Sequence, residues 1–243
     1  MGATAPGSLI STTVIGNCDV LAMLCLVQAA APGTPFIYAP ALAVIDPRSG
    51  RYSGGAVEGG LLGASATEMG RYYGLPVEAS GIGTDHHVPS IQAGYERALN
   101  GLLPVLSWPD ILVGPGLLGG SMILSLEQLL IDVEVFRMCK RARRGIVVDE
   151  NKWLDEVIQN IGPGGGFLAE YSTVDGIHEG EWYVSKFGGH GTFEAWDAAG
   201  RPSLVEEARG KVNQILFSHQ PLPLDAEIER ELDRIQGRAQ EET

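Results

Sequence analysis

The chain has 243 residues and a mass of 25.8 kDa, and 44% of its residues are hydrophobic, which is enough to bury a core in one large or two small domains. This composition excludes a disordered chain, and the 33 glycines follow no period, which excludes collagen. The formal net charge of −13 has the wrong sign for binding a phosphate backbone, so we expect no nucleic-acid partner.

Short apolar strands and amphipathic helices alternate through the first part of the chain. The predicted elements are, in chain order, a helix over 18–31 capped by Asn17, a strand over 35–41, a loop over 46–55, a helix over 58–73, a strand over 75–80, a loop over 81–90, a helix over 91–103, a strand over 110–114 and a helix over about 125–143. Each strand is apolar on both faces, as in parallel strands covered by helices. The pattern therefore predicts an α/β fold of parallel β/α units.

The pattern changes after Gly145. The later features are a short helix over 150–160, a glycine stretch over 162–166, an irregular aromatic segment to Trp196, a helix with a capping box of Ser203 and Glu206, and a last helix with a stripe of Ile228, Leu232 and Ile235. We therefore expect β/α units in residues 1–145 and a helical C-terminal extension in residues 146–243.

Three parallel strands leave both edges of a sheet without a partner, which compact soluble folds rarely tolerate. The opening residues, MGATAPGSL, indicate a loop that follows a strand absent from the chain. We therefore expect the chain to need a complement, and to associate when it is alone.

Cys18, Cys25 and Cys139 are odd in number, and none lies in a CxxC motif. We therefore expect neither a disulfide framework nor a zinc site, and a reducing cytoplasm fits best. The longest apolar stretch, over 20–31, is interrupted by Gln28 and is shorter than the ~20 residues that a membrane span needs. No basic region precedes it, so we expect neither a membrane segment nor a signal peptide.

The run GPGLLG over 114–119 has the spacing G-x-G-x-x-G of a dinucleotide-binding turn. The next helix begins too late for that function, and Asp132 and Glu134 fall inside it. We instead expect a glycine turn where a ligand or the backbone approaches closely, and Gly114 and Gly116 are candidate substrate-binding positions.

Asp85, His86 and His87 follow the second predicted strand, at the loop end where β/α proteins place catalytic groups. They are the leading catalytic candidates, and the alternative is a set of hydrogen bonds that shape the loop. The other three histidines show no metal-ligand spacing, so we expect no metal.

Aromatic, hydroxyl and acidic side chains in the first two units could face one pocket. These substrate-binding candidates are Tyr38, Asp46, Tyr52, Glu58, Ser80 and Thr84. Aromatic rings among carboxylates suit an organic cation, which gains about 0.5–2 kcal/mol over an aromatic face. The alternative for each tyrosine is half-buried packing with a solvated hydroxyl.

Segments along nearly the whole chain share the order and motifs of one protein family. They are GATAPGSLIST, AAAPGTPFIYAPALAVIDPRSGRYSGGAVEGGLL, TDHHVPSIQAGYERALNGLL, SLEQLLIDVEVFRMCKRARRGIVVDE, IGPGGGFLAEYST, FEAWDAAGRPSLVEEARGKVNQIL and the acidic last helix. The chain resembles the trimethylamine methyltransferase family of corrinoid-dependent methyltransferases, most specifically in P-x-x-QAGYE.

The resemblance implies a (β/α)₈ TIM barrel, of which this chain corresponds to the C-terminal half with its helical extension. It implies methyl transfer from a methylated amine to the cobalt of a corrinoid (cobalamin) carried by a cognate corrinoid protein, with no cofactor bound tightly by this chain. The other implied partner is a complementary N-terminal half-barrel or a second copy in a homo-oligomer.

Two features of the sequence refine this resemblance. Some members of the family carry pyrrolysine and this chain has none, so it resembles the branch whose substrates include quaternary amines such as glycine betaine. The paired histidines of TDHHVPS depart from the family's usual pattern. The competing hypothesis is a non-catalytic truncated relative that acts as a docking or assembly partner.

Overall fold

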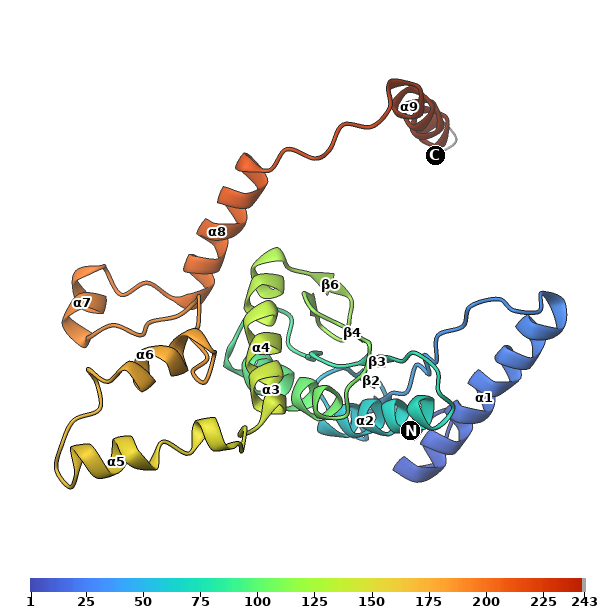
Figure 1. The fold of residues 1–243 in the computed structure, drawn as a ribbon. Coiled ribbons are helices and arrows are strands. Elements are labelled where there is room, and N and C mark those ends of the chain that lie inside the picture. The colour runs from blue at the N-terminus through green and yellow to red at the C-terminus, as the bar shows by residue number, and fades with distance from the viewer. Residues whose placement is uncertain (242–243) are drawn as a thin grey trace. The chain divides into compact units, whose positions relative to one another are not determined.

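The computed structural model describes residues 1–241 (Figure 1). The chain divides into two compact units, Met1–Arg209 and Gly210–Thr243. The elements are α1 (Leu9–Ala30), β1 (Val44–Ile45), β2 (Tyr52–Ser53), α2 (Val57–Tyr72), β3 (Glu78–Ser80), α3 (Ile91–Leu106), β4 (Ile111–Val113), β5 (Leu117–Leu118), β6 (Ile123–Leu124), α4 (Leu126–Arg144), a 3₁₀ turn (Glu150–Lys152), α5 (Asp155–Ile161), α6 (Tyr171–His178), α7 (Phe193–Ala198), α8 (Leu204–Ser218) and α9 (Ala226–Glu241). The chain is thus a mixed α/β protein, as predicted.

The three segments predicted as strands do run parallel in the first unit. β3 and β4 pair in parallel, with Ala79 opposite Leu112, and Tyr38 makes a parallel bridge to Val77. The prediction of a full strand over 35–41 is wrong, because only this one residue pairs. Pro35 and Pro40 flank the bridge and have no N–H to donate to a ladder.

Two antiparallel hairpins were not predicted. β1 and β2 pair across the segment predicted as the loop 46–55, with Val44 opposite Ser53. β5 and β6 pair with Leu117 opposite Leu124, in the stretch before α4. The sheets of the described residues are therefore small, with two strands each.

Helices pack side by side around the parallel pair, with α2 contacting both α1 and α3, and α3 contacting α4. Glycines permit the close approach of α2. A Cβ on Gly60 would lie 2.9 Å from the Asn100 Cα, and one on Gly63 would lie 2.7 Å from the Ser80 carbonyl oxygen. The apolar core beneath α1 and α2 centres on Val20, Tyr38, Ala66 and Val77.

Helix α1 begins at Leu9 rather than at residue 18, and Ser8 rather than Asn17 is its N-cap. The early start follows from packing, since the Thr13 hydroxyl lies 2.9 Å from that of Ser65 on α2. The prediction that no apolar segment reaches membrane-spanning length is therefore wrong: α1 has 22 residues and a mean hydropathy of 1.8 over its most apolar window. By length and composition alone it could cross a membrane, but a core helix passes the same test.

Side-chain caps mark two helix starts farther along the chain, and the second of these caps was predicted. The Ser125 hydroxyl accepts from Gln128 N, and Ser203 and Glu206 form the full reciprocal capping box. The segment expected to be irregular contains α6 and α7. Glu134 of α4 holds it by accepting bonds from Ser185 Oγ at 2.7 Å and Lys186 N at 2.6 Å.

The second unit contains the end of α8 and all of α9. The predicted stripe of α9 is present, with Ile228, Leu232 and Ile235 on a helix whose side chains are exposed by 54%, 50% and 55% at these positions. The domain boundary expected at Gly145 falls at the C-cap of α4 and stays a prediction.

Candidate functional site

A cavity of about 160 Å³ opens where the two parallel strands end. Ser80 and Gly81 reach it from the end of β3, and Val113 and Gly114 from the end of β4. Tyr52, from β2, lies at its wall. We call this the strand-end cavity. Of the predicted substrate-binding residues, the structure brings Tyr52, Ser80 and Gly114 together here.

Asp85 lies behind this wall and holds it in place. Its carboxylate accepts hydrogen bonds from Ser53 Oγ at 2.5 Å, Gly54 N at 2.6 Å and Gly55 N at 3.3 Å. Ser53 and Gly54 line the cavity. The carboxylate of Asp85 therefore acts on the cavity through the backbone that it fixes, which is the loop-shaping alternative considered for it.

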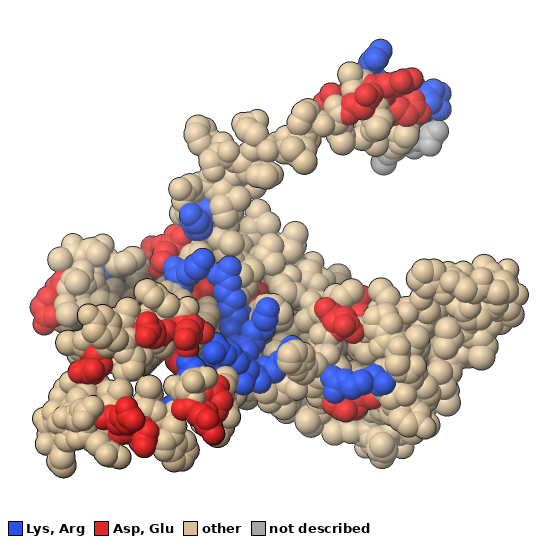
Figure 2. Space-filling model, in the orientation of Figure 1, with Lys and Arg blue, Asp and Glu red and all other residues tan. Residues whose placement is uncertain are grey.

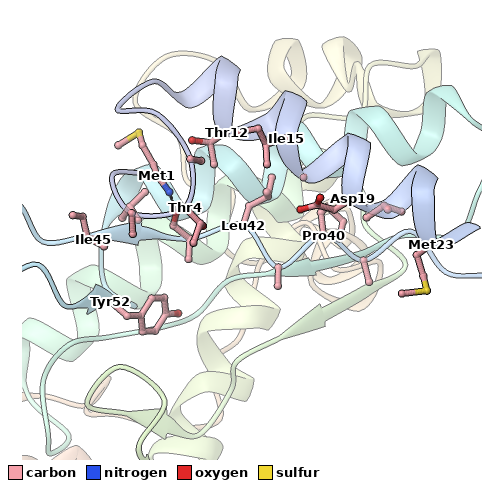
Figure 3. Close-up of a pocket in the computed structure, with 18 of the residues that line it drawn as sticks. Met1, Thr4, Thr12, Ile15, Asp19, Met23, Pro40, Leu42, Ile45 and Tyr52 are labelled. Carbon is pink, nitrogen blue, oxygen red and sulfur yellow. Dashed lines mark hydrogen bonds between the residues drawn. The ribbon is translucent and has the colours of Figure 1, made fainter.

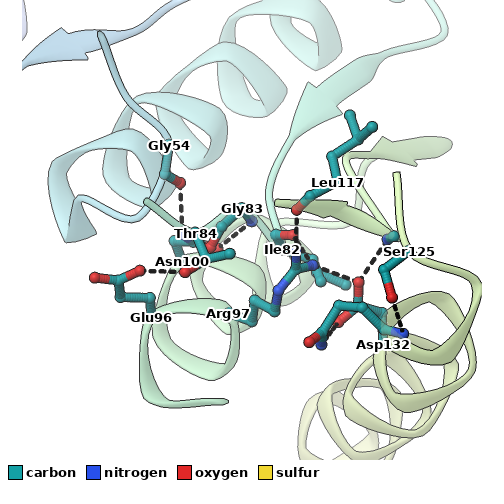
Figure 4. Close-up of polar contacts among 12 residues, drawn as sticks. Gly54, Ile82, Gly83, Thr84, Glu96, Arg97, Asn100, Leu117, Ser125 and Asp132 are labelled. Carbon is teal, nitrogen blue, oxygen red and sulfur yellow. Dashed lines mark hydrogen bonds and ion pairs between the residues drawn. The ribbon is translucent and has the colours of Figure 1, made fainter. Parts of the chain in front are cut away.

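Two polar side chains of α3 hold the loops from the other side (Figure 4). Glu96 accepts from the Thr84 hydroxyl at 2.5 Å and from Asp85 N at 3.0 Å. The Asn100 amide donates to the Gly54 carbonyl at 3.0 Å and to the Gly83 carbonyl at 2.9 Å, and its oxygen accepts from Gly83 N at 3.0 Å. Predicted residue Thr84 is thus buried beneath the loop rather than exposed to a ligand.

An ion pair between Arg97 and Asp132 joins α3 to α4, and both side chains are completely buried. Arg97 also donates to the carbonyl oxygens of Ile82 and Leu117, at the ends of two different loops (Figure 4). Asp132 accepts from Gly116 N at 2.6 Å. Burial raises the pKa of the Asp132 carboxyl, and the charge of Arg97 and the bond from Gly116 oppose that rise.

The two predicted histidines lie on the loop between β3 and α3. His86 Nδ1 lies 2.9 Å from the Val88 carbonyl oxygen and 3.0 Å from Ser90 Oγ, and Ser90 is the N-cap of α3. His87 is exposed, and a Cβ on Gly119 would lie 3.1 Å from its ring. His86 is therefore committed to local bonds, whereas the ring of His87 faces solvent beside the turn before β6.

Three other predicted residues lie outside the strand-end cavity. Tyr38 is 1% exposed, and its hydroxyl donates to Asn17 Oδ1 at 3.0 Å within the core. Burial, with a smaller effect of Tyr73, raises the pKa of Tyr38 to about 12. The Asp46 carboxylate binds the Arg48 guanidinium at 2.9 Å, which lowers the pKa of Asp46. Glu58 lies in the first turn of α2.

The glycine turn lies between β4 and α4. Gly114 has a φ of 121°, where a Cβ would collide with the Gly81 carbonyl, so the strand ends approach closely there. The N–H of Gly116 is bonded to Asp132, and α4 begins only at Leu126. Neither feature presents a free helix N-terminus to a pyrophosphate, in agreement with the sequence argument.

A larger cavity of about 540 Å³ lies between α1 and residues 36–45 (Figure 3). Its wall is mostly apolar and includes Ile15, Met23 and Leu42, with Asp19 as a charged exception. Tyr52 lines this cavity as well as the strand-end cavity. Within residues 1–241, no group of three His, Cys, Asp or Glu side chains could hold a metal ion.

Sequence reasoning missed the buried polar residues of α3 and α4. These are Arg97 and Asn100 on α3, with Gln128, Asp132 and Glu134 on α4, and sequence reasoning also missed the half-buried Glu96 of α3. On α4, Gln128 and Asp132 are more deeply buried than Leu126, which is 40% exposed. The available signal was a charged or amide residue on the buried side of an amphipathic helix, where it needs a partner.

The whole chain, residues 1–243, matches the family model described as Trimethylamine methyltransferase (MTTB). Trimethylamine methyltransferase MttB of Methanosarcina barkeri (strain Fusaro) is 35% identical over 98% of this chain and 48% of its own length. Glycine betaine methyltransferase of Desulfitobacterium hafniense (strain Y51) is 32% identical over 95% of this chain and 48% of its own length. The chain thus spans about half the length of the curated relatives it matches.

Proposed function

The chain belongs to the trimethylamine methyltransferase family, and from that premise we propose that it binds a methylated amine in the strand-end cavity and takes part in the transfer of one methyl group. The observation that carries the proposal is the position of this cavity. It opens at the carboxyl ends of β3 and β4, where β/α proteins hold their substrates. The parallel segments would be part of a (β/α)₈ barrel completed by a complementary half or a second copy.

The wall of the cavity suits a cation without N–H donors. A quaternary ammonium makes no strong hydrogen bonds, so its affinity comes from aromatic faces and nearby negative charge, with about 0.5–2 kcal/mol from each ring. Tyr52 supplies a ring that is 50% exposed, and Asp85 supplies a carboxylate one residue layer behind Ser53. We therefore favour a quaternary amine such as glycine betaine as the substrate.

The candidate catalytic residues have different roles in this proposal. Asp85 is a positioning residue, because its oxygens are occupied by Ser53, Gly54 and Gly55. His86 fixes the start of α3 through Ser90. His87 is the residue of the three that would contact the substrate or the methyl acceptor, since its exposed ring lies beside the turn that carries Leu117 and Ser121 to the cavity.

The methyl acceptor would be a corrinoid carried by a partner protein, which supplies the nucleophile. A corrin ring is far larger than a cavity of about 160 Å³, so the acceptor would meet the substrate at the mouth. A quaternary amine leaves as a neutral amine, so no proton has to be delivered to it. The demands on this chain are orientation of the substrate and stabilisation of its charge. We expect the reaction in the cytoplasm.

Reconstitution tests this proposal. The chain is combined with the complementary N-terminal half of a relative and with reduced corrinoid protein, and corrinoid methylation is followed by absorbance with glycine betaine or trimethylamine. We expect turnover that falls at least tenfold in Tyr52→Leu and little in Tyr72→Leu, a matched change at a tyrosine that is 79% exposed on α2. Complementation without turnover would instead favour a docking partner.

A further inference from the structure

An exposed tryptophan lies at the opposite ends of the parallel strands from the strand-end cavity. Trp108 follows α3, is 58% exposed and has a φ of 65°, a left-handed backbone conformation that is rare for a bulky residue. The guanidinium of Arg143, from α4, stacks over its indole ring. The backbone thus holds an aromatic ring at the surface, where an arginine covers one of its faces.

A second arginine approaches the same place. Arg71, from the end of α2, donates to the carbonyl oxygens of Ser107 and Trp108. Burial and the nearby charge of Arg71 lower the pKa of Arg143. Among the described residues, Arg143 makes no ion pair or side-chain hydrogen bond, whereas its neighbours Arg141 and Arg144 both pair with Glu181. Two like charges therefore converge, and the N–H donors of one are unused.

Arg71 and Trp108 line a shallow groove of about 700 Å³, and Arg143 reaches its edge through the stack on Trp108. Leu75 and Pro76 contribute apolar surface to it, and Asp110, just before β4, contributes a carboxylate. We call it the Trp108 groove. It combines cationic donors with an apolar surface, and tryptophan and arginine are the residues that most often dominate binding energy at protein interfaces.

The helix that carries Arg143 is unusually basic at its C-terminal end for a chain with a net charge of −13. Lys and Arg side chains gather over the C-terminal part of α4 (Figure 2). They are Arg137, Lys140, Arg141, Arg143 and Arg144. A basic surface on an acidic protein attracts acidic partners and repels other basic surfaces.

We infer that the Trp108 groove binds an acidic peptide segment of a partner protein, with a carboxylate on Arg143 and Arg71 and an apolar side chain on Leu75 and Pro76. A guanidinium binds a carboxylate through two parallel hydrogen bonds, which uses the free donors of Arg143 and relieves its repulsion from Arg71. The partner's carboxylate would thus pair with Arg143, which has no ion pair among the described residues.

A phosphate group fits the groove less well. Glu68 lies 3.4 Å from Arg71, and Asp110 lines the groove, so a dianion would meet two carboxylates at close range. A single carboxylate carries half that charge, and a peptide gains the apolar contact that a free anion lacks. The observations therefore favour a peptide segment over inorganic phosphate.

Peptide titration tests the inference with the full chain. A fluorescein-labelled peptide of sequence Glu-Leu-Glu-Glu-Leu-Glu is titrated by anisotropy, and the same peptide with Lys in place of Glu measures the need for carboxylates. We expect binding of the acidic peptide to weaken at least tenfold in Arg143→Ala and in Trp108→Ala, and less in Arg143→Lys. Arg137→Ala is the matched control, because it removes the same charge from the same helix, and we expect it to change affinity by less than about twofold.

Thermal melts by circular dichroism show whether each variant is folded, and Arg143→Lys keeps the test valid should Arg143→Ala destabilise the chain. Equal affinity of wild type, Arg143→Ala and Arg143→Lys would overturn the inference. Displacement of the peptide by inorganic phosphate at an equal concentration would overturn it in favour of a simple anion site. Equal binding of the Lys peptide would also overturn it.

Discussion

Helix α3, beside the strand-end cavity, and helix α9, in the second unit, differ in how far their side chains are buried. Helix α3 buries Arg97 and Asn100 completely, and these side chains bond to backbone groups of loops far away in the sequence. Helix α9 has no buried side chain within its described residues, and its apolar stripe is half exposed. The loops of the site are therefore held by bonds between distant segments, whereas a bond within α9, such as that from Arg230 Nε to the Ala226 carbonyl, is local.

The largest expected effect comes from breaking the buried ion pair. Arg97→Met leaves the Asp132 carboxylate without its partner, so we expect the free energy of unfolding to fall by about 3–5 kcal/mol. Urea denaturation measures it. The control is Asp197→Ala, which removes an exposed pair with Arg201 and should cost less than about 1 kcal/mol. Similar losses in both variants would erase the contrast between buried and exposed pairs.

Asp85→Asn tests whether a carboxylate bonded to loop backbone at the wall of the strand-end cavity matters more for stability than an exposed carboxylate. The neutral amide accepts hydrogen bonds more weakly than the carboxylate and presents donors to the N–H groups of Gly54 and Gly55. We expect a loss of about 2 kcal/mol in stability. Asp19→Asn, an exposed acid at the other cavity, should leave the stability unchanged. An unaltered melting temperature in Asp85→Asn would show that these bonds do not hold the wall.

The pH dependence of Tyr38 provides a smaller test of core bonding. Its pKa is raised to about 12 in the folded chain, above the value near 10 in the unfolded chain, so the folded state keeps its proton longer. The contribution of the protonated Tyr38 hydroxyl to the free energy of unfolding is complete below pH 10 and is lost as the pH rises toward 12. We expect wild type to lose on the order of 1 kcal/mol relative to Tyr38→Phe by pH 11. If the difference in the free energy of unfolding between wild type and Tyr38→Phe stays constant from pH 9 to 11, the burial of this hydroxyl is contradicted.

The smallest effect is expected on α9. Leu232→Ala removes a side chain that is 50% exposed, and we expect stability to change by less than about 0.5 kcal/mol. Leu62→Ala in α2 is the reference, because Leu62 is 1% exposed and its truncation should lower the free energy of unfolding by about 2–5 kcal/mol. A comparable loss in both variants would show that the stripe of α9 is covered in solution.

Much of the fold followed from short-range signals. The helices at Ile91 and Leu126 begin after Ser90 and Ser125, whose hydroxyls accept from the first turns. The parallel order of residues 38, 77–80 and 111–113 followed from apolar runs between helices. The sequence missed the start of α1, because Thr12 and Thr13 have low helix propensity and are held by contacts with α2 and with the preceding turn.

The sequence indicated where the candidate site lies but not which side chains contact one another there. The strand ends lead to Ser80 and Gly114, as expected, and Tyr52 joins them. Tyr38 entered the core instead, because its position faces α1 and α2 rather than the cavity. No pattern in the sequence indicates to which side of the strands the side chain of a single bridging residue such as Tyr38 points.

The sequence by itself determined where α3, α4 and α8 begin, which segments run parallel, and the family, because caps, apolar periodicity and family motifs are properties of neighbouring residues. Tertiary structure alone decided the bonding partners of Asp85, Glu96, Arg97 and Asp132. Each is a charged residue that local rules place at the surface. Each is instead stabilised by backbone N–H and C=O groups that approach it only in the folded chain, where burying a charge without such partners would cost several kcal/mol.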